Sequence, residues 1–372
     1  MTLTTSQQRH HYRELLSIGF PIIIGQLGTI ILGFADTLMI GHHSTEELAA
    51  AGLVNNIITF ILVSYMGFSY GLTPIIGKLY GMEKTDEIGQ KVKNSFFANM
   101  VVGVIFSLAL IILYFNLHRI GQPEELLALI RPYFIVNLIS VLFVGVFNTL
   151  KQFLDGIGNT KVAMWVMIMG NVVNIFGNWV LIYGVGPCPE MGLLGAGIST
   201  LASRVLMAVA MVGIIAGTKE YREYRNNIIA SRINGADFRE MNRLGWPVAL
   251  QLALESGAFT LSCVMVGWLG TIPLAAHQVM ITISQLFYLV LSGMAAALAI
   301  RVSHFVGQND FTAVRRNAYD GWRLNLLFSL CMGIPVLLLR HQIGGWFNDN
   351  VEVQQYVAML IIMMMLYQFG DG

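Results

Sequence analysis

Residues 15–41 read LLSIGFPIIIGQLGTIILGFADTLMIG, and this stretch decides the class of the protein. No charged side chain occurs between residues 15 and 35, and a run of about 18–20 apolar residues is long enough to cross a bilayer as a helix. One carboxylate, Asp36, follows within the same run. The stretch therefore predicts a transmembrane helix that carries an acid.

The whole chain shares this composition. Of its 372 residues, 55% are hydrophobic and 12% are charged, whereas about 25% of an ordinary soluble domain is charged. The three cysteines are far apart and form neither a disulfide framework nor a metal-binding spacing. We predict an all-α polytopic membrane protein with ten spans, at residues 14–41, 48–77, 94–117, 126–150, 161–184, 192–217, 241–268, 273–303, 318–340 and 352–372.

The distribution of lysine and arginine predicts the orientation. If the ten spans alternate in direction, 18 of the 22 basic residues lie on the side of the N-terminus and three on the opposite side, while Arg204 lies within a span. Cytoplasmic loops carry the excess of positive charge in membrane proteins. We therefore expect a multi-pass protein of the plasma membrane, the inner membrane in a bacterium, with a cytoplasmic N-terminus.

The two halves of the chain resemble each other. A shift of 226 residues aligns IGFP (18–21) with LGWP (244–247), LAA (48–50) with LAA (274–276), and Asn99 with Asn325. Parallel repeats of this kind are a recurring transporter architecture. We expect two six-helix bundles related by a pseudo-two-fold axis, namely an N-lobe at 1–217 and a C-lobe at 244–372, joined by a cytoplasmic linker at 218–243. Two full copies would need about 450 residues, so we expect the second bundle to be truncated after its fourth span.

Asp36 is the first candidate functional residue. It lies five residues before Gly41, which places it roughly 7–8 Å inside the outer boundary of the bilayer. A charge at such a depth costs at least about 2.5–3.5 kcal/mol, so an intramembrane acid indicates a functional site that faces a cavity. A carboxylate that reaches the outer surface, or that only makes a structural bond, is the alternative.

Asparagines of the fifth predicted span supply partners for Asp36. Asn171, Asn174 and Asn178 occupy one face of a helix, and Asn178 and Thr200 lie at a depth similar to that of Asp36. Carboxylate, amide and hydroxyl oxygens suit a small hard cation such as Na⁺, or a carboxylate that takes up a proton. The same side chains also serve as hydrogen-bonding contacts between membrane helices. No other metal site is expected.

Two further acids lie in the second half. Glu255 is near the predicted bilayer midplane, and Asp371 follows a long uncharged run, so the two could form a second acidic site. A carboxylate can bind a coupling ion or a cationic cargo, but not both tightly at once. Competition for this negative charge would couple the flux of the ion to the flux of the cargo, because each ligand shifts the equilibrium between the transporter's conformations. The sequence thus predicts an exchanger with no cofactor, driven by Na⁺ or H⁺.

Other classes of function fit less well. A membrane enzyme would need a catalytic pair, which the sequence does not offer, and a channel would need a pore, usually formed by symmetric subunits. A flippase for lipid-linked saccharides has a related fold but needs a basic cavity, and here Arg204 is the one buried base against three acids. The flippase is kept as the alternative to an antiporter.

Several motifs together resemble the MATE (multidrug and toxic compound extrusion) transporters, in their NorM-like branch. They are the stretch from FPIIIGQLGTIILGFADTLMIG (20–41) through LAAAG (48–52), the segment LDGIGNTK (154–161), the asparagines of the fifth span and the repeat of the two halves. The resemblance covers nearly the whole chain after about residue 12. It implies a V-shaped pair of six-helix bundles that exports organic cations in exchange for Na⁺ or H⁺.

The resemblance also implies roles for individual residues. Asp36, Asn174, Asn178 and Thr200 would form the cation site of the N-lobe, and Glu255 and Asp371 would bind cation or substrate in the C-lobe. The expected partners are small organic cations and membrane lipid, without nucleic acid, and we expect a monomer.

Overall fold

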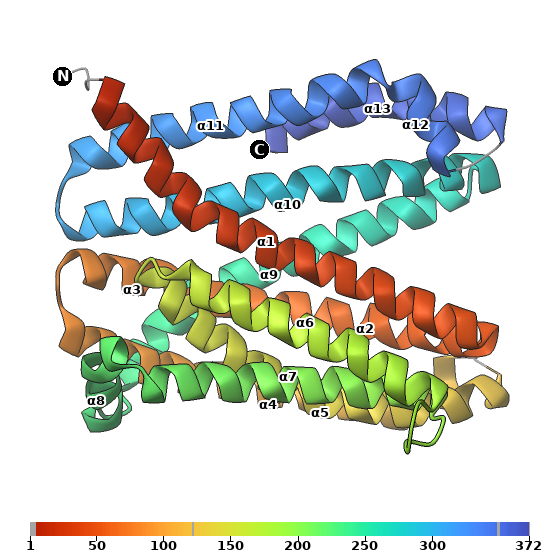
Figure 1. The fold of residues 1–372 in the computed structure, drawn as a ribbon, viewed down its shortest axis with the longest axis horizontal. Coiled ribbons are helices and arrows are strands. Elements are labelled where there is room, and N and C mark those ends of the chain that lie inside the picture. Colours follow the sequence, from red (N-terminus) through yellow and green to blue (C-terminus); the bar gives the residue numbers. More distant parts are fainter. Residues whose placement is uncertain (1–4, 121–122, 348–349, 372) are drawn as a thin grey trace. The chain divides into compact units, whose positions relative to one another are not determined.

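The computed structural model describes residues 5–120, 123–347 and 350–371, and the side chains of residues 5–10, 120, 369 and 371 lie outside this description. The described residues contain helices and no strand (Figure 1). The α-helices are α1 (Thr5–His43), α2 (Thr45–Tyr70), α3 (Leu72–Gly81), α4 (Thr85–Phe115), α5 (Glu124–Gly156), α6 (Thr160–Tyr183), α7 (Gly192–Gly217), α8 (Arg222–Ala230), α9 (Gly235–Gly267), α10 (Thr271–Gly307), α11 (Phe311–Leu338), α12 (Arg340–Phe347) and α13 (Val351–Asp371). Two short 3₁₀ turns, η1 (Leu117–Ile120) and η2 (Lys219–Tyr221), complete them.

Ten helical segments in the described part of the chain are long and apolar enough to cross a membrane. They follow the ten predicted spans, so the fold class is confirmed. The second span is divided, because the helix is interrupted at Gly71 between α2 and α3. A Cβ atom at Gly71 would lie 2.9 Å from the backbone nitrogen of Gly245 on α9. The interruption therefore lies where two backbones approach each other closely.

The chain divides into two compact units. The α2–α8 unit comprises residues 24–253 and 306–308, and the terminal unit comprises residues 1–23, 254–305 and 309–372. Helices α1, α9 and α10 each contribute residues to both units. The units follow helix packing rather than order along the chain, so the division into N-lobe, linker and C-lobe stays a prediction.

The core of the α2–α8 unit is built around a buried tyrosine. Tyr65 on α2 is fully buried, and its hydroxyl donates to the carbonyl of Asn99 on α4 at 2.8 Å. Gly103 on α4 and Gly145 on α5 make room for the ring, because a Cβ atom at Gly145 would lie 1.8 Å from the Tyr65 hydroxyl. Small residues at helix contacts are the usual way for membrane helices to approach closely.

The terminal unit has cores of its own. Phe287 on α10 packs with Val357 and Ile361 on α13 in one buried cluster. A buried arginine, Arg301 on α10, pairs with Glu14 on α1 at 2.5 Å. Long-range contacts of this kind hold the start of the chain against helices that follow it by almost 300 residues.

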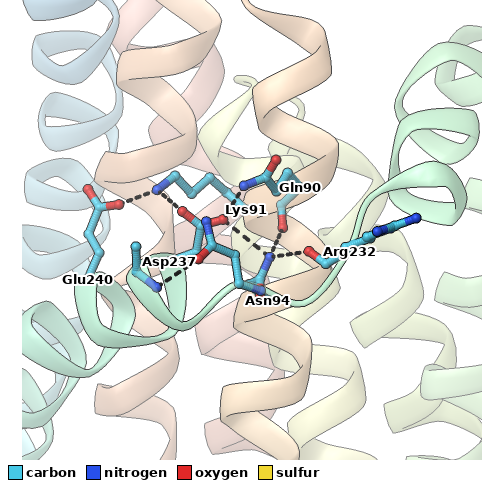
Figure 2. A network of polar contacts seen from close by, with 8 residues as sticks. Gln90, Lys91, Asn94, Arg232, Asp237 and Glu240 are labelled. Atoms are coloured by element: carbon cyan, nitrogen blue, oxygen red, sulfur yellow. Dashed lines mark hydrogen bonds and ion pairs between the residues drawn. The ribbon is translucent and has the colours of Figure 1, made fainter.

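The polar segment between the sixth and seventh spans is folded and bound to α4. Asp237 on α9 is buried and accepts hydrogen bonds from Gln90 at 2.5 Å and Lys91 at 2.7 Å. Lys91 also pairs with Glu240, and Asn94 accepts from the backbone N–H of Asn234 at 2.7 Å. Figure 2 shows the Lys91 ammonium group between the two acids, with Asn94 beside the backbone of the segment. The contacts fix the start of α9 on α4.

Candidate functional site

Helix α1 carries Asp36 into the α2–α8 unit. The helix continues without interruption from Thr5 to His43, and Asp36 lies two turns before its end. The Asp36 carboxylate is partly buried, and its Oδ1 accepts a hydrogen bond from Asn178 Nδ2 at 2.5 Å. The carboxylate is therefore held by a neighbouring helix rather than extended toward the membrane surface.

The asparagines of α6 face the same interior. Asn174 and Asn178 are both fully buried, and their amide groups contact each other. With its nitrogen toward the carboxylate, the Asn174 amide donates to Asp36 Oδ1 at 3.0 Å. Its oxygen then accepts from the backbone N–H and the hydroxyl of Thr200, both at 3.2 Å. Asn174 thus links α1 to α7.

Glycines allow α6 and α7 to approach closely enough for this contact. A Cβ atom at Gly177 would lie 2.4 Å from Ser199 Oγ, and one at Gly195 would lie 2.6 Å from the carbonyl oxygen of Leu181. The Ser199 hydroxyl donates to the backbone carbonyl of Asn174 at 2.7 Å. Close packing also explains the glycines of the segment GLLGAG at 192–197. The two helices lie side by side in Figure 1.

The structure therefore brings four predicted residues together. We call Asp36, Asn174, Asn178 and Thr200 the Asp36 site. Ser203, one turn after Thr200 and also on α7, extends it, since its hydroxyl lies 3.5 Å from the Asn174 amide atom that faces α7. Four of these five side chains are uncharged, so the site holds one formal negative charge among neutral oxygen and nitrogen atoms.

One buried oxygen of the site is unused. Asn178 Oδ1 accepts no hydrogen bond from the described residues, although its amide nitrogen is bonded to Asp36. A buried carbonyl oxygen without a partner costs free energy of the order of 1–3 kcal/mol. An oxygen in this position, beside a carboxylate, is suited to contact a cation.

The third asparagine of the stripe is placed differently. Asn171 lies one turn before Asn174, and its Nδ2 atom is buried without a hydrogen-bond acceptor among the described residues. It fits against α1 because residue 28 is glycine, and a Cβ atom there would lie 2.7 Å from that nitrogen. Asn171 thus packs on α1 without joining the hydrogen bonds of the Asp36 site.

Comparison with known proteins identifies the family. The sequence profile of the MatE family matches residues 21–180 and 247–372, which is more than half of the chain. The chain belongs to the MatE family. A MatE chain with ten membrane-spanning helices among its described residues is a multi-pass membrane transporter.

Solved structures agree with this fold. A MATE protein in complex with MaD3S superposes with a TM-score of 0.87 at 20% identity, over 97% of this chain and 80% of that one. The eukaryotic MATE transporter AtDTX14 gives 0.84 at 18% identity, over 98% and 81% of the two chains. A MOP superfamily transporter from Pyrococcus furiosus, for which a reversed polarity of the binding pocket is described, gives 0.82 at 19% identity, over 97% and 80%. At such identities the likeness shows the fold.

The acids predicted for the second half of this MatE chain belong to the terminal unit. Glu255 lies on α9 and is partly buried. Asp371 is the last residue of α13, and its side chain lies outside the described residues. The predicted acidic site formed by these two residues therefore stays a prediction.

A second polar row near the Asp36 site was not predicted from the sequence. On α5, Tyr133 donates to Asn55 Oδ1 on α2 at 3.0 Å, Asn137 donates to the Tyr133 carbonyl at 3.1 Å, and Ser140 donates to the Asn137 carbonyl at 2.6 Å. Their spacing, i, i+4 and i+7, is that of one helical face, the pattern that identified the asparagines of α6. Ser203 could be found likewise, because it follows Ser199 by four residues.

Proposed function

We propose that the MatE chain exports small organic cations in exchange for Na⁺ or H⁺, and that the Asp36 site binds the coupling ion. The observation that carries this proposal is a carboxylate in a membrane-spanning helix bound by neutral amides, with no ion pair within 4.0 Å among the described side chains. Neutral ligands leave the negative charge available to a mobile cation.

The atoms of the site fit a small hard cation. The carboxylate of Asp36, the unused Oδ1 of Asn178 and the hydroxyl of Thr200 are all oxygen donors. Hard cations prefer such donors, whereas softer metals prefer imidazole and thiolate. The described residues contain no group of three or more His, Cys, Asp or Glu side chains that would suit another metal. A proton on Asp36 would satisfy the same carboxylate.

Exchange follows from competition for negative charge. A ligand shifts a conformational equilibrium only by as much as its affinities for the two states differ. When the site is empty, a carboxylate without a bound cation favours the conformation that hydrates it, and a bound cation reduces that preference. Glu255 and Asp371 are the proposed partners of the cationic cargo. The ion gradient would supply the energy, with no bound cofactor, from an N-terminus on the cytoplasmic side of the bacterial inner membrane.

The proposal is tested by transport in vesicles. The full-length protein is reconstituted in liposomes loaded with ethidium, and Na⁺ and proton gradients are imposed separately. We expect efflux to follow one of the two gradients and Asp36→Asn to slow it at least tenfold, because the amide cannot exchange a cation. Asp86→Asn, which removes an exposed acid from the first turn of α4, is the matched control and should transport normally.

Two results would reject the proposal. One is a folded, monodisperse protein that moves ethidium with neither gradient. The other is an Asp36→Asn variant that transports with the same dependence on the ion gradient as the unmodified protein.

A further inference from the structure

A partly buried arginine lies beside the Asp36 site. Arg204 follows Thr200 by four residues on α7, so the two side chains leave the same face of the helix. Its Nη1 donates to the hydroxyl of Ser140 on α5, and Ser140 is fully buried. The arginine is therefore anchored between two helices, on the side of α7 that faces the site.

Arg204 and Asp36 attract each other without forming an ion pair. The charges of Arg204 and Asp36 are close enough to act on each other, and both act on Tyr133 of α5. In the described structure no guanidinium nitrogen of Arg204 lies within 4.0 Å of a carboxylate oxygen of Asp36. Ser140 binds the guanidinium and Asn178 binds the carboxylate. The opposite charges are thus near each other but separately anchored.

This arrangement sets the charge of the interior. Arginine stays protonated in proteins, so Asp36 and Arg204 together are neutral when the site is empty and carry one positive charge when a Na⁺ ion or a proton is bound. The bound ion is then repelled by the guanidinium. Inside a protein such repulsion is stronger than in water, because the local dielectric constant is lower.

We propose that Arg204 sets the ion affinity of the Asp36 site by competing with the bound cation for the carboxylate. The inference rests on the proposed function, since it concerns the same ion. A resident positive charge weakens ion binding, so the ion is released where its concentration is low. It also opposes the entry of divalent and bulky organic cations, which restricts the site to a small monovalent ion.

Ion binding is measured directly, without transport. The purified full-length protein is heated at increasing NaCl, with choline chloride keeping the ionic strength constant, and the half-effective Na⁺ concentration is read from the rise in melting temperature. The same titration against pH, without Na⁺, reports proton binding. An ion that binds only the folded state raises the apparent stability by RT ln(1 + c/Kd), where c is the free ion concentration, so the dependence on ion concentration reports the affinity.

Removal of the positive charge should tighten binding. We expect Arg204→Gln to lower the half-effective ion concentration roughly tenfold or more, which corresponds to about 1.4 kcal/mol. Arg204→Lys keeps the charge and should stay within about threefold of the unmodified protein, a rescue that a purely structural role of the guanidinium would not give. Arg131→Gln, an exposed arginine on α5, is the matched control and should change nothing.

Ser140→Ala tests the inference in the opposite direction. Without its anchor the guanidinium is free to move toward Asp36, so the half-effective concentration should rise by about threefold, although the charge of the interior is unchanged. This variant decides the matter if Arg204→Gln does not give monodisperse protein.

The outcomes separate the two proposals. The role of Arg204 is overturned, and the proposed function stays intact, if the ion response is lost in Asp36→Asn but unchanged in Arg204→Gln. If Arg204→Gln does not fold, an unchanged ion response in Ser140→Ala overturns the role of Arg204 in the same way. If neither Na⁺ nor protons stabilise the unmodified protein, the proposed function fails, and the role of Arg204 fails with it.

Discussion

Gly177→Ala should disturb the Asp36 site through helix packing alone. The new Cβ atom would lie 2.4 Å from Ser199 Oγ, a distance that real Cβ contacts do not adopt. Ser199 is buried, and its hydroxyl donates to the carbonyl of Asn174 at 2.7 Å. Either the helices separate or the hydroxyl rotates away and this hydrogen bond between α7 and α6 is lost.

The expected magnitude follows from these two terms. Overpacking of a dense core costs about 1–3 kcal/mol, and loss of one buried hydrogen bond costs about 0.5–1.5 kcal/mol. We therefore expect Gly177→Ala to lower the free energy of unfolding by roughly 2–4 kcal/mol. Ser199→Ala alone loses the hydrogen bond and should cost about 1 kcal/mol.

The double variant distinguishes a clash from a general intolerance of alanine. In Gly177→Ala/Ser199→Ala the clashing oxygen is gone, and the nearest remaining atom, the Cβ of residue 199, is at 3.2 Å. The pair should therefore regain about 1–3 kcal/mol relative to Gly177→Ala, the coupling typical of residues in contact. Gly213→Ala is the matched control, because a Cβ atom there meets nothing within 4 Å.

Stability is measured by unfolding in mixed detergent micelles, and the ion-dependent rise in melting temperature reports on the site. Gly177→Ala should also weaken the ion response, since Asn174 moves with α6. If Gly177→Ala is as stable as the unmodified protein, or if the double variant is no more stable than Gly177→Ala, the close approach of α6 and α7 does not depend on Gly177 and the reasoning is refuted.

Two further perturbations test contacts outside the site. Lys91→Met should lower the free energy of unfolding of the α2–α8 unit by roughly 1–3 kcal/mol, because it leaves the buried Asp237 carboxylate without its ammonium partner. Lys84→Met removes one side of a half-exposed ion pair and should cost less than about 0.5 kcal/mol. Equal unfolding midpoints for the two variants would contradict this expectation. His43 contacts Glu47 and Glu190 at 2.8 Å each, through its two ring nitrogens, and both bonds require the doubly protonated ring. Protection from hydrogen exchange in the loop at 184–191, relative to the intrinsic exchange rate at each pH, should therefore be higher below about pH 6 than above neutrality. His43→Gln should abolish that difference in protection.

Much of the Asp36 site was predictable from local pattern. The acid was visible because a charge within an uncharged run is rare, and Asn174 and Asn178 because their spacing repeats with the helix. Thr200 was placed with them by depth alone. Tyr133, Asn137 and Ser140 have the same kind of spacing, but nothing in the sequence indicates that α5 faces α7 at this level.

The sequence by itself determined the number of spans, the predicted side of the membrane for each end, and the presence of an acid at lipid depth. These features depend on hydrophobic length and on charge, which are properties of single segments. Tertiary structure alone decided that the helix is interrupted at Gly71, that Asn174 meets Thr200, and that Arg204 is held by Ser140 rather than paired with Asp36. Such contacts join helices far apart in the chain, and they depend on where glycines let two backbones approach, which no single segment specifies.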